Sequence, residues 1–350
     1  MRAAAADVVI LGAGPVGCAL ALALGETNLR VRIVDGRARP ASFRPIALSY
    51  ASRLILERLG VWNDLSPTSI ETIHVSQAGG FGRTRMDAAD AGVPALGYVV
   101  ELSALEAVLK SKVEKYLIDE PIDSPCTVHA EGVSPEAKET PYDQEAVVGL
   151  VQTEPPAESE AFERFTPEGP LALLPLRGRY ALIWSARPGN ARALVAMPEL
   201  EFLAALATAA GRRPGRPVAV EGRAVQRLAL RVRPARVGPR AIYIGNAAQT
   251  LHPVAGQGLN LGLRDAWELA QIWRGAQDPG DASLLARYAA RRRLDAEATI
   301  RVTHWLAGGF IGGNRLSRIA RGAALTALDV LPGPRRFFAR RMIYGPSALP

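Results

Sequence analysis

The sequence contains little cysteine, few aromatic residues and no long apolar run, and each scarcity excludes a class of protein. Two cysteines in 350 residues, Cys18 and Cys126, exclude a scaffold held by disulfides and favour a reducing compartment. No apolar run approaches the roughly 20 residues that a membrane-spanning helix needs. The short apolar run near the N-terminus lacks the pattern of a signal peptide. We therefore expect a globular, cytoplasmic protein.

Metal ligands and hydrolytic nucleophiles are also scarce. The four histidines, His74, His129, His252 and His304, are scattered along the chain without metal-ligand spacing. The sequence contains no G-x-S-x-G segment and no other nucleophile and base arrangement. We therefore expect neither a metal site nor a hydrolase.

Positive charge is concentrated towards the end of the chain. Residues 281–350 carry twelve arginines against four acidic residues, which accounts for the whole net charge of +8. Such an excess favours an anionic partner. Because zinc-finger spacing, RNA-binding signatures and interleaved aromatic and basic residues are all missing, we expect no nucleic acid. An anionic membrane surface and a simple solvated surface both stay open.

A glycine-rich loop near the N-terminus follows an apolar strand and opens an apolar helix. The strand spans residues 7–11, residues 12–17 read GAGPVG, and the helix continues over 19–24. Gly12 would allow the tight turn, Gly14 the approach of a pyrophosphate, and Gly17 the packing of helix on strand. A second strand, 31–34, ends in Asp35, which is placed to bind a ribose. This stretch predicts a site for FAD or NAD.

The middle of the chain predicts local elements. Short alternating runs between residues 145 and 186 indicate an antiparallel sheet, of the kind that often forms the floor of a substrate pocket. Ser49 is expected to cap one helix, and Ser103 with Glu106 to form the capping box of another. A strand is expected from Cys126 to Ala130.

A second glycine-rich loop lies between residues 241 and 265. An apolar strand over 241–244 ends at Gly245-Asn246, and Gly256, Gly258 and Gly262 surround the start of a helix. Small residues keep bulky side chains away from a flat ligand. Backbone N–H groups at a helix start suit a flavin ring, which becomes anionic when it is reduced. The second loop therefore favours FAD.

Together these motifs resemble those of the ubiquinone-biosynthesis hydroxylases. The stretches PIALSYASRLILERLGVW (45–62), FERFTPEGPLALLPL (162–176) and RGAALTALDVLPGPRRFFARRMIYG (321–345) extend the resemblance over nearly the whole chain. These hydroxylases are class A flavin monooxygenases with the fold of para-hydroxybenzoate hydroxylase. The similarity is greatest to the 2-polyprenyl-6-methoxyphenol hydroxylase branch.

The resemblance implies an α/β fold. A Rossmann-like FAD-binding domain is expected to be discontinuous over residues 1–75, 96–135 and 235–280. An inserted substrate domain with an antiparallel sheet is expected over 76–95 and 136–234. Residues 281–350 are expected to form a helical C-terminal region.

The resemblance also implies an FAD-dependent monooxygenase that uses NAD(P)H and O2 to hydroxylate a polyprenylated phenol in ubiquinone biosynthesis. The cofactor carries the difficult chemistry in such enzymes, so no catalytic acid or base is assigned. The residues that the resemblance places against FAD are Gly12, Gly14, Pro15, Val16, Gly17, Asp35, Arg44, Gly245, Asn246, Pro253, Gly256, Gln257, Gly258, Leu259 and Asn260.

Two features depart from the family pattern. Asn246 stands where the family has an aspartate that accepts hydrogen bonds from the ribityl chain of FAD, and its loss of charge is expected to weaken binding by about 1–2 kcal/mol. Glu131-Gly132 replaces an Asp-Gly motif and follows Tyr116 much sooner than in the family. The strands that normally occupy this interval are expected to be missing.

Two alternatives to the active polyprenyl-phenol hydroxylase stay open. One is a paralogue that acts as a non-catalytic or weakly FAD-binding component of a ubiquinone-biosynthesis complex. The other is a hydroxylase of a small soluble aromatic acid. Residues 303–331 combine apolar helical spacing with arginines, and would contact the inner face of an anionic membrane, a partner protein or their own domain.

Overall fold

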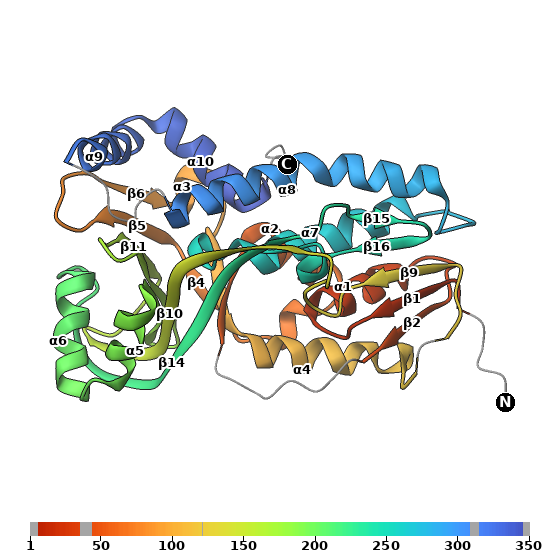
Figure 1. Ribbon diagram of the computed structural model, residues 1–350, viewed down its shortest axis with the longest axis horizontal. Coiled ribbons are helices and arrows are strands. Elements are labelled where there is room, and N and C mark those ends of the chain that lie inside the picture. The colour runs from red at the N-terminus through yellow and green to blue at the C-terminus, as the bar shows by residue number, and fades with distance from the viewer. Residues whose placement is uncertain (1–5, 36–43, 121, 309–314, 346–350) are drawn as a thin grey trace.

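A six-stranded sheet forms from strands that lie far apart in the sequence (Figure 1). In the computed structural model, which describes residues 6–35, 44–120, 122–308 and 315–345, five of these strands run parallel and β15 joins the edge antiparallel. Residues 8–10 are all buried, so both faces of the sheet are covered. In spatial order the strands are β15 (Val237–Gly238), β16 (Ala241–Tyr243), β9 (Cys126–His129), β1 (Val8–Leu11), β2 (Val31–Val34) and β8 (Leu117–Ile118).

Helix α1 (Pro15–Leu24) connects the parallel strands β1 and β2 and packs against α4 (Leu102–Val113) and α7 (Gln257–Ile272). Its sequence is apolar around most of its circumference, which matches this burial on several sides. Burial raises the pKa of the thiols of Cys18 on α1 and Cys126 on β9 to about 12. Both cysteines are therefore packing residues of this core.

An eight-stranded sheet forms the other half of the molecule. Neighbouring strands pair antiparallel except β11 and β5, which are parallel. The two longest strands, β10 and β14, curve from this sheet towards the six-stranded one (Figure 1). In spatial order the strands are β17 (Gln249–Thr250), β14 (Arg216–Val232), β10 (Lys138–Glu154), β13 (Arg179–Ala186), β12 (Pro170–Leu176), β11 (Glu160–Phe165), β5 (Thr72–Gln77) and β6 (Arg83–Asp87).

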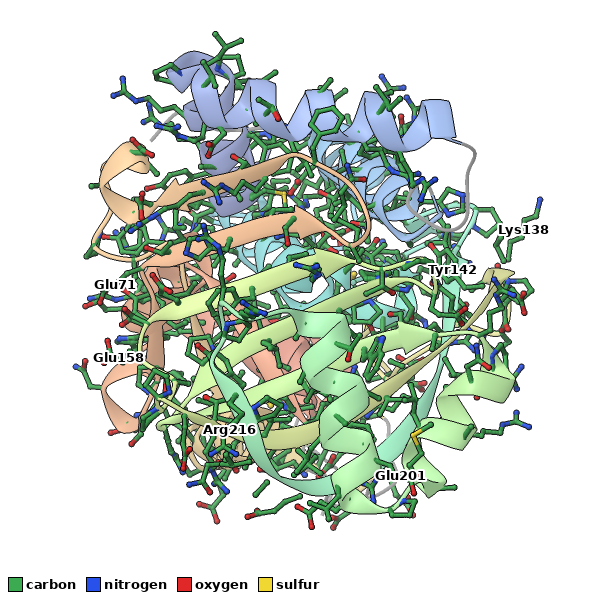
Figure 2. The ribbon with its side chains drawn as sticks, turned by 90° about the vertical axis from the view of Figure 1, so that its left-hand side faces the viewer. Glu71, Lys138, Tyr142, Glu158, Glu201 and Arg216 are labelled. Atoms are coloured by element: carbon green, nitrogen blue, oxygen red, sulfur yellow. The ribbon has the colours of Figure 1, made fainter. Side chains whose placement is uncertain are left out.

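Two helices cover the outer face of the eight-stranded sheet. Figure 2 views this face, with α5 (Pro188–Ala196) and α6 (Glu199–Ala210) lying across the strands. Phe202 of α6 is fully buried and lies beside Trp184 of β13. Because this face carries its own apolar core, the opposite face is left to line a cavity.

A small third sheet and short helices join the two large sheets. Strand β7 (Gly97–Glu101) pairs antiparallel with β3 (Pro45–Ser49) and β4 (Thr68–Ile70). The chain turns from β3 into α2 (Tyr50–Arg58), with the Ser49 hydroxyl accepting a bond from Ser52 N–H. The remaining short helices are α3 (Ala88–Ala91) and the 3-10 helices η1 (Trp62–Asp64), η2 (Glu114–Tyr116), η3 (Gly245–Ala247) and η4 (Val254–Gly256).

Three helices close the chain and cover the open side of the cavity. Helix α8 (Ala282–Gly308) packs on α7, α9 (Arg315–Val330) on β5 and β6, and α10 (Pro332–Tyr344) on α2 and α3. The Arg335 guanidinium lies 3.0 Å from the Asp90 carboxylate and ties α10 to α3. None of the helices in the described parts of the chain has the length and apolar character that crossing a bilayer requires.

The structure confirms the predicted fold class and most local elements. The cap at Ser49, the antiparallel sheet after residue 145 and strand β9 are all present. The predicted capping box at Ser103 is wrong, because α4 begins at Leu102 directly after β7 and no side chain of the described residues caps it. Strand β5 begins at Thr72 and belongs to the eight-stranded sheet. The domain limits themselves stay a prediction.

Candidate FAD and substrate site

The first glycine loop is closed on its protein side and open on its cavity side. At Gly12, φ is +106° and a Cβ atom would lie 2.6 Å from Glu131 Cα. At Gly17, a Cβ atom would lie 2.1 Å from the carbonyl oxygen of Gly12. A Cβ atom at Gly14 would meet nothing within 4 Å. The protein itself excludes side chains at positions 12 and 17, whereas position 14 leaves room for a ligand.

Helix α1 begins at the edge of this opening. Gly14 is its extended N-cap residue, Pro15 is its first helical residue, and no side chain of the described residues caps it. The first N–H groups of a helix have no acceptor within the helix and form the positive end of its dipole. This geometry suits the pyrophosphate of a dinucleotide.

Asp35 follows the end of β2 and borders the same opening. Its Oδ2 atom accepts a hydrogen bond of 2.8 Å from Lys110 Nζ on α4. This bond raises the pKa of Lys110. A carboxylate accepts more than one bond, so Lys110 can fix the side chain and leave acceptor capacity for ribose hydroxyls.

The second glycine loop meets the first at Val16. A Cβ atom would lie 2.7 Å from Val16 Cγ2 at Gly262 and 3.1 Å from it at Gly245. At Gly256, φ is +59°, which lets η4 turn into α7, and a Cβ atom there would lie 3.0 Å from Ala47. Glycine is therefore required where α1, β3 and α7 converge.

Asn260 holds α7 against the β3 and α2 junction. Its Oδ1 atom accepts bonds from Ser49 N–H at 2.8 Å and from Ser52 Oγ at 2.7 Å. Its Nδ2 atom donates to the carbonyl oxygens of Ala47 at 3.0 Å and Gly256 at 2.7 Å. The side chain borders the cavity, but its polar atoms are committed to the protein.

A buried charge cluster, formed by Arg236, Arg264, Asp265, Arg292 and Asp295, joins α7 to α8. Arg292 Nε donates to Asp265 Oδ1 at 2.7 Å, and Arg264 Nε donates to Asp295 Oδ2 at 2.8 Å. Burial alone would raise the pKa of Asp295, but the two arginines bring it below its usual value. Both aspartates of the cluster are thus held in ion pairs with its arginines.

The buried charge cluster also positions the second glycine loop. Asp265 Oδ2 accepts bonds from Gly245 N–H at 3.3 Å and from Gln249 Nε2 at 3.0 Å. Asp265 is fully buried, so these bonds are shielded from water. The side chain of Asp265 on α7 therefore holds the turn at Gly245-Asn246 in place.

One cavity of about 1210 Å³ extends between the glycine loops and the eight-stranded sheet. It exceeds the range of about 300–1,000 Å³ that single-ligand pockets usually occupy. All of the residues predicted to bind FAD border it except Gly17, which packs behind Gly12. The structure therefore brings both glycine loops, Asp35 and Arg44 to one site; contact of each residue with FAD stays a prediction.

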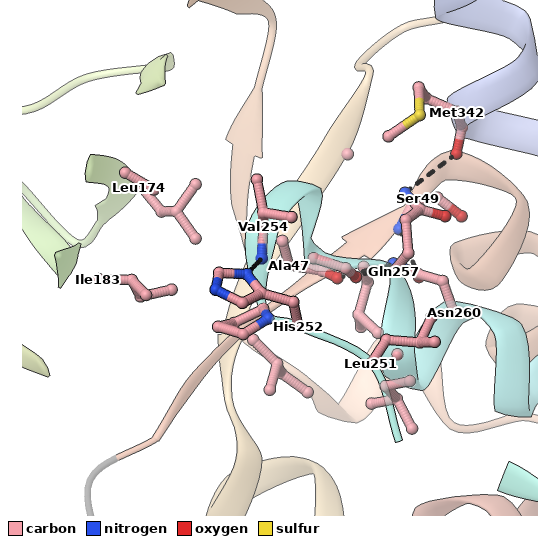
Figure 3. A pocket seen from close by; sticks show the side chains of 18 of the residues that line it. Ala47, Ser49, Leu174, Ile183, Leu251, His252, Val254, Gln257, Asn260 and Met342 are labelled. Carbon is pink, nitrogen blue, oxygen red and sulfur yellow. Dashed lines mark hydrogen bonds between the residues drawn. The ribbon is translucent and has the colours of Figure 1, made fainter. Parts of the chain in front are cut away.

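The cavity continues past the loops into a region with mostly apolar walls (Figure 3). Leu174 and Ile183 of the sheet lie on the opposite side from Gln257 and Met342. We call the part covered by the C-terminal helices the apolar branch. Thr84 on β6 and Arg321 on α9 also border the cavity, and the apolar wall residues of the branch are Ile73, Val75, Met86, Leu96, Ala320, Ala324, Leu325, Leu328, Phe338, Ala339, Met342 and Ile343.

His252 stands between the two parts of the cavity, with both ring nitrogens engaged. Nδ1 accepts a bond from Val254 N–H at 3.1 Å (Figure 3). Nε2 therefore carries the proton and donates to Gln144 Oε1 at 3.2 Å. Burial lowers the pKa of His252 to about 4. The imidazole is therefore neutral and structural at physiological pH.

The interval before Glu131 is short, as predicted. Residues 119, 120 and 122–125 form no strand, and β9 follows to pair in parallel with β1 and β16. Glu131 and Gly132 reach the cavity beside Gly12. His129 Nδ1 lies 2.8 Å from Glu131 Oε1, and its ring stacks on Tyr243. The shortened segment therefore still delivers its acidic residue to the first glycine loop.

The sequence interpretation missed Glu163, a carboxyl group inside the cavity. The signal was present, because Ala161, Glu163 and Phe165 share one face of β11, and a charge between two apolar neighbours is unusual. It also missed the buried charge cluster, because the members on α7 and the members on α8 are far apart in the sequence.

Among the described residues, no group of side chains is suited to hold a metal ion.

Comparison with known proteins places these features in context. A family model described as an FAD binding domain matches residues 126–303. Ubiquinone hydroxylase UbiL of Rhodospirillum rubrum is 31% identical, over 96% of this chain and 89% of its own length. The 3-demethoxyubiquinol 3-hydroxylase of Escherichia coli is 30% identical, over 83% of this chain and 86% of its own length.

Solved structures show the same architecture. The crystal structure of p-nitrophenol 4-monooxygenase PnpA from Pseudomonas putida DLL-E4 has a TM-score of 0.77, with 96% of each chain covered and 17% identity. At this identity the likeness bears on the fold alone.

Proposed function

This chain belongs to the ubiquinone-hydroxylase family of FAD-dependent monooxygenases, and we propose that its substrate is a phenol that carries a polyprenyl chain. The apolar branch is the observation that carries the substrate assignment. A polyprenyl chain is long and apolar, and each buried CH2 group contributes about 0.8 kcal/mol to binding. The apolar branch offers such a chain a wall of aliphatic side chains from β5, β6, α9 and α10.

The residues of the glycine loops fit FAD. Gly14 leaves open space at the N-terminus of α1, where a pyrophosphate is favourable, and Asp35 is fixed beside it. The exposed side chain of Asn246 and the N-terminus of α7 border the same cavity. When bound, FAD supplies electron transfer from NAD(P)H and activation of O2.

The protein's own contribution is to position the cofactor and the substrate and to exclude water from the site. The N-terminus of α1 would bind the pyrophosphate, and the N-terminus of α7 would orient the flavin ring. Asn260 and the buried charge cluster hold α7 in place for this role. The apolar walls, with Leu174, Ile183 and Met342, keep solvent away from the reacting ring.

The C-terminal helices would contact the inner face of a membrane. Because ubiquinone precursors are apolar lipids, the substrate would pass from that membrane surface into the site. Helices α9 and α10 line the apolar branch on one side and expose large apolar side chains and arginines on the other. Apolar contact combined with attraction to anionic lipids is the usual basis of interfacial binding. The exposed large apolar residues of α9, of α10 and of the link between them are Ile319, Val330, Leu331 and Phe337.

A series of 2-prenylated phenols with lengthening chains tests the substrate assignment. The FAD-loaded protein should consume NAD(P)H and O2 faster with each added isoprene unit until the apolar branch is filled, and kcat/KM should rise accordingly. A preference for 4-hydroxybenzoate would instead favour a small aromatic acid. A protein that stays colourless in excess FAD would contradict the use of this cofactor.

Sedimentation with vesicles tests the membrane contact. Binding to phosphatidylglycerol vesicles should fall as salt is raised, because the arginine attraction is screened. Phe337→Asp should weaken it further, while an equivalent change at the exposed Leu200 on α6 should not. Equal binding to neutral vesicles, or none at low salt, would contradict the proposal.

A further inference from the structure

Glu163 is a single carboxyl group on an otherwise apolar stretch of the sheet. It lies on β11 between Ala161 and Phe165, which point to the same face because strand residues alternate. All three border the cavity. Register places Val75 of β5 on one side of Glu163 and Ala172 of β12 on the other.

The surroundings of Glu163 provide no partner. No hydrogen bond or ion pair involves it among the described residues, and its Oε1 atom is shielded from solvent. The next residue beyond Val75 in the same row is Thr84, whose hydroxyl is likewise buried without a partner. Beyond Ala172 comes Ile183. Burial in this apolar setting raises the pKa of Glu163 to about 7.

Other charged groups do not compensate Glu163. His74 and Glu160, on the flanking strand positions, pair with each other at 3.6 Å on the opposite face. His252, also in the cavity, is neutral and uses both ring nitrogens. The further charged side chains that border this cavity are Asp35, Arg44, Glu106, Lys110, Glu131, Arg227, Arg231 and Arg321.

A purely structural role does not explain a carboxyl group at this position. A carboxyl oxygen that is buried without a hydrogen bond, as Oε1 of Glu163 is, is unfavourable for folding, and an apolar residue of similar size would be better accommodated among Val75, Ala172 and Ile183. Groups retained under such conditions in a cavity are candidates for chemistry. The cavity is also where a phenol ring would lie if the proposed function holds.

We propose that Glu163, given the proposed phenol substrate, is a catalytic residue that binds the phenolic hydroxyl and accepts its proton. The position combines an ionisable carboxyl with an apolar enclosure on the sheet face of the cavity. No other acidic residue on this sheet borders the cavity among the described residues. Asp35, Glu106 and Glu131 belong to the side of the first glycine loop.

The proton transfer balances with the overall hydroxylation. The phenolic O–H bond breaks, its proton passes to a carboxylate oxygen of Glu163, and its electron pair stays on the phenolate oxygen. The negative charge raises electron density on the ring carbons ortho and para to that oxygen. One of these carbons forms a bond to one oxygen atom of O2 and releases its hydrogen as a proton.

The second oxygen atom leaves as water, with NAD(P)H supplying two electrons and a hydride hydrogen and the medium supplying a proton. Glu163 returns its proton to the phenolate oxygen before the product leaves. A base whose pKa lies near neutral pH is well matched to this cycle, because it is ionised before the reaction and gives the proton back afterwards.

Ligand binding without turnover tests the role of Glu163 in the wild-type protein. The probes are 2-geranylphenol and its methyl ether, titrated against the oxidised FAD-loaded protein without NAD(P)H. The phenol donates to an ionised carboxyl, so its affinity should rise as the pH increases through about 7. The ether only accepts, so its affinity should fall over the same range. Parallel pH profiles for the two probes would overturn the proposal.

The variant Glu163→Gln provides the second test, with Glu158→Gln as the matched control on the exposed turn before β11 (Figure 2). In Glu163→Gln the opposing pH slopes should disappear, and kcat should fall about 100-fold or more while FAD content is unchanged. The control should retain wild-type slopes and rates. Wild-type slopes in Glu163→Gln would overturn the proposal.

Different results would contradict the proposed function and the role of Glu163. If neither probe binds to the wild-type protein and no prenylated phenol stimulates NAD(P)H oxidation, the proposed function fails. If the phenol binds and is turned over, but Glu163→Gln reacts at the wild-type rate, the role of Glu163 alone fails.

Discussion

The two ends of the cavity are built in different ways. The end at the glycine loops is made mainly by backbone and by close packing, with Gly12, Gly17 and Gly262 each excluding a Cβ atom. The end at the sheet is made by side chains from β5, β11, β12, β13, α9 and α10. An end that is built by backbone tolerates few residue types, which suits a ligand that does not change. An end that is built by side chains can change its residues to suit a different substrate.

The two ends also differ in how they carry charge. At the glycine loops, the buried charge cluster is internally paired and supports the loop from outside the cavity. At the sheet, Glu163 borders the cavity and has no charged or hydrogen-bonding partner in the part of the chain that the structure describes. Paired buried charge fixes a structure, while an unpaired ionisable group is available for reaction.

The largest expected effect comes from breaking the buried charge cluster. Asp265→Asn would leave the three buried arginines of the cluster with Asp295 as their one carboxylate within it and should lower the free energy of unfolding by about 3–5 kcal/mol. The matched control is Asp278→Asn, whose exposed pair with Arg240 should change stability much less, because solvent screens it. Urea unfolding of both variants measures the difference. Equal, small losses would show that the cluster does not support the glycine-loop end.

A second effect concerns Glu163 and pH. Its pKa rises from 4.5 in the unfolded chain to about 7 in the folded protein, so the folded state binds more protons between these values. Stability should therefore fall as pH rises from about 5 to 8, by up to about 3 kcal/mol.

Glu163→Gln does not titrate and should remove this loss. The variant should become more stable than the wild type towards pH 8, while Glu158→Gln follows the wild type. Thermal unfolding across the pH range gives the comparison. A constant difference between Glu163→Gln and the wild type at all pH values would show that the carboxyl is not shifted.

A third effect separates folding from ligand binding within one loop. Gly17→Ala places its Cβ atom against the Gly12 carbonyl and should destabilise even the FAD-free protein by about 1–3 kcal/mol. Gly14→Ala meets open space, so it should fold normally and lose FAD affinity. Unfolding and FAD titration of both variants check this. Identical behaviour of the two would contradict the division between a closed and an open side.

The smallest effect tests the departure at Asn246. Asn246→Asp would add a charged acceptor at the cavity border and should tighten FAD binding by about 1–2 kcal/mol, or roughly tenfold. Fluorescence titration of the FAD-free protein measures the affinity. Unchanged or weaker binding would show that the residue does not face the ribityl chain.

Local patterns predicted the glycine-loop end well. The G-x-G-x-x-G turn, the strands around it, the cap at Ser49 and the small residues of the second loop act over a few residues each, so periodicity and residue type describe them. The capping box at Ser103 failed because the strand before it runs directly into α4. Here the tertiary position of β7 overrode a local preference.

Contacts between distant segments were beyond the sequence patterns. Asn260 bonds to Ser49, which lies 211 residues away in the sequence, and Asp265 pairs with Arg292 on another helix. No local periodicity encodes such pairings. Glu163 is a case between these two. The alternation of β11 shows that Glu163 shares a face with apolar residues, but only the fold shows that this face borders the cavity.

Product analysis with isotopically labelled O2 tests the central claim most directly. The FAD-loaded protein, NAD(P)H and 2-geranylphenol should give a hydroxylated phenol that contains one labelled oxygen atom, with NAD(P)H consumed in equal amount. NAD(P)H consumption that yields only hydrogen peroxide, or a product with oxygen from water, would contradict the account of this protein as a prenyl-phenol hydroxylase.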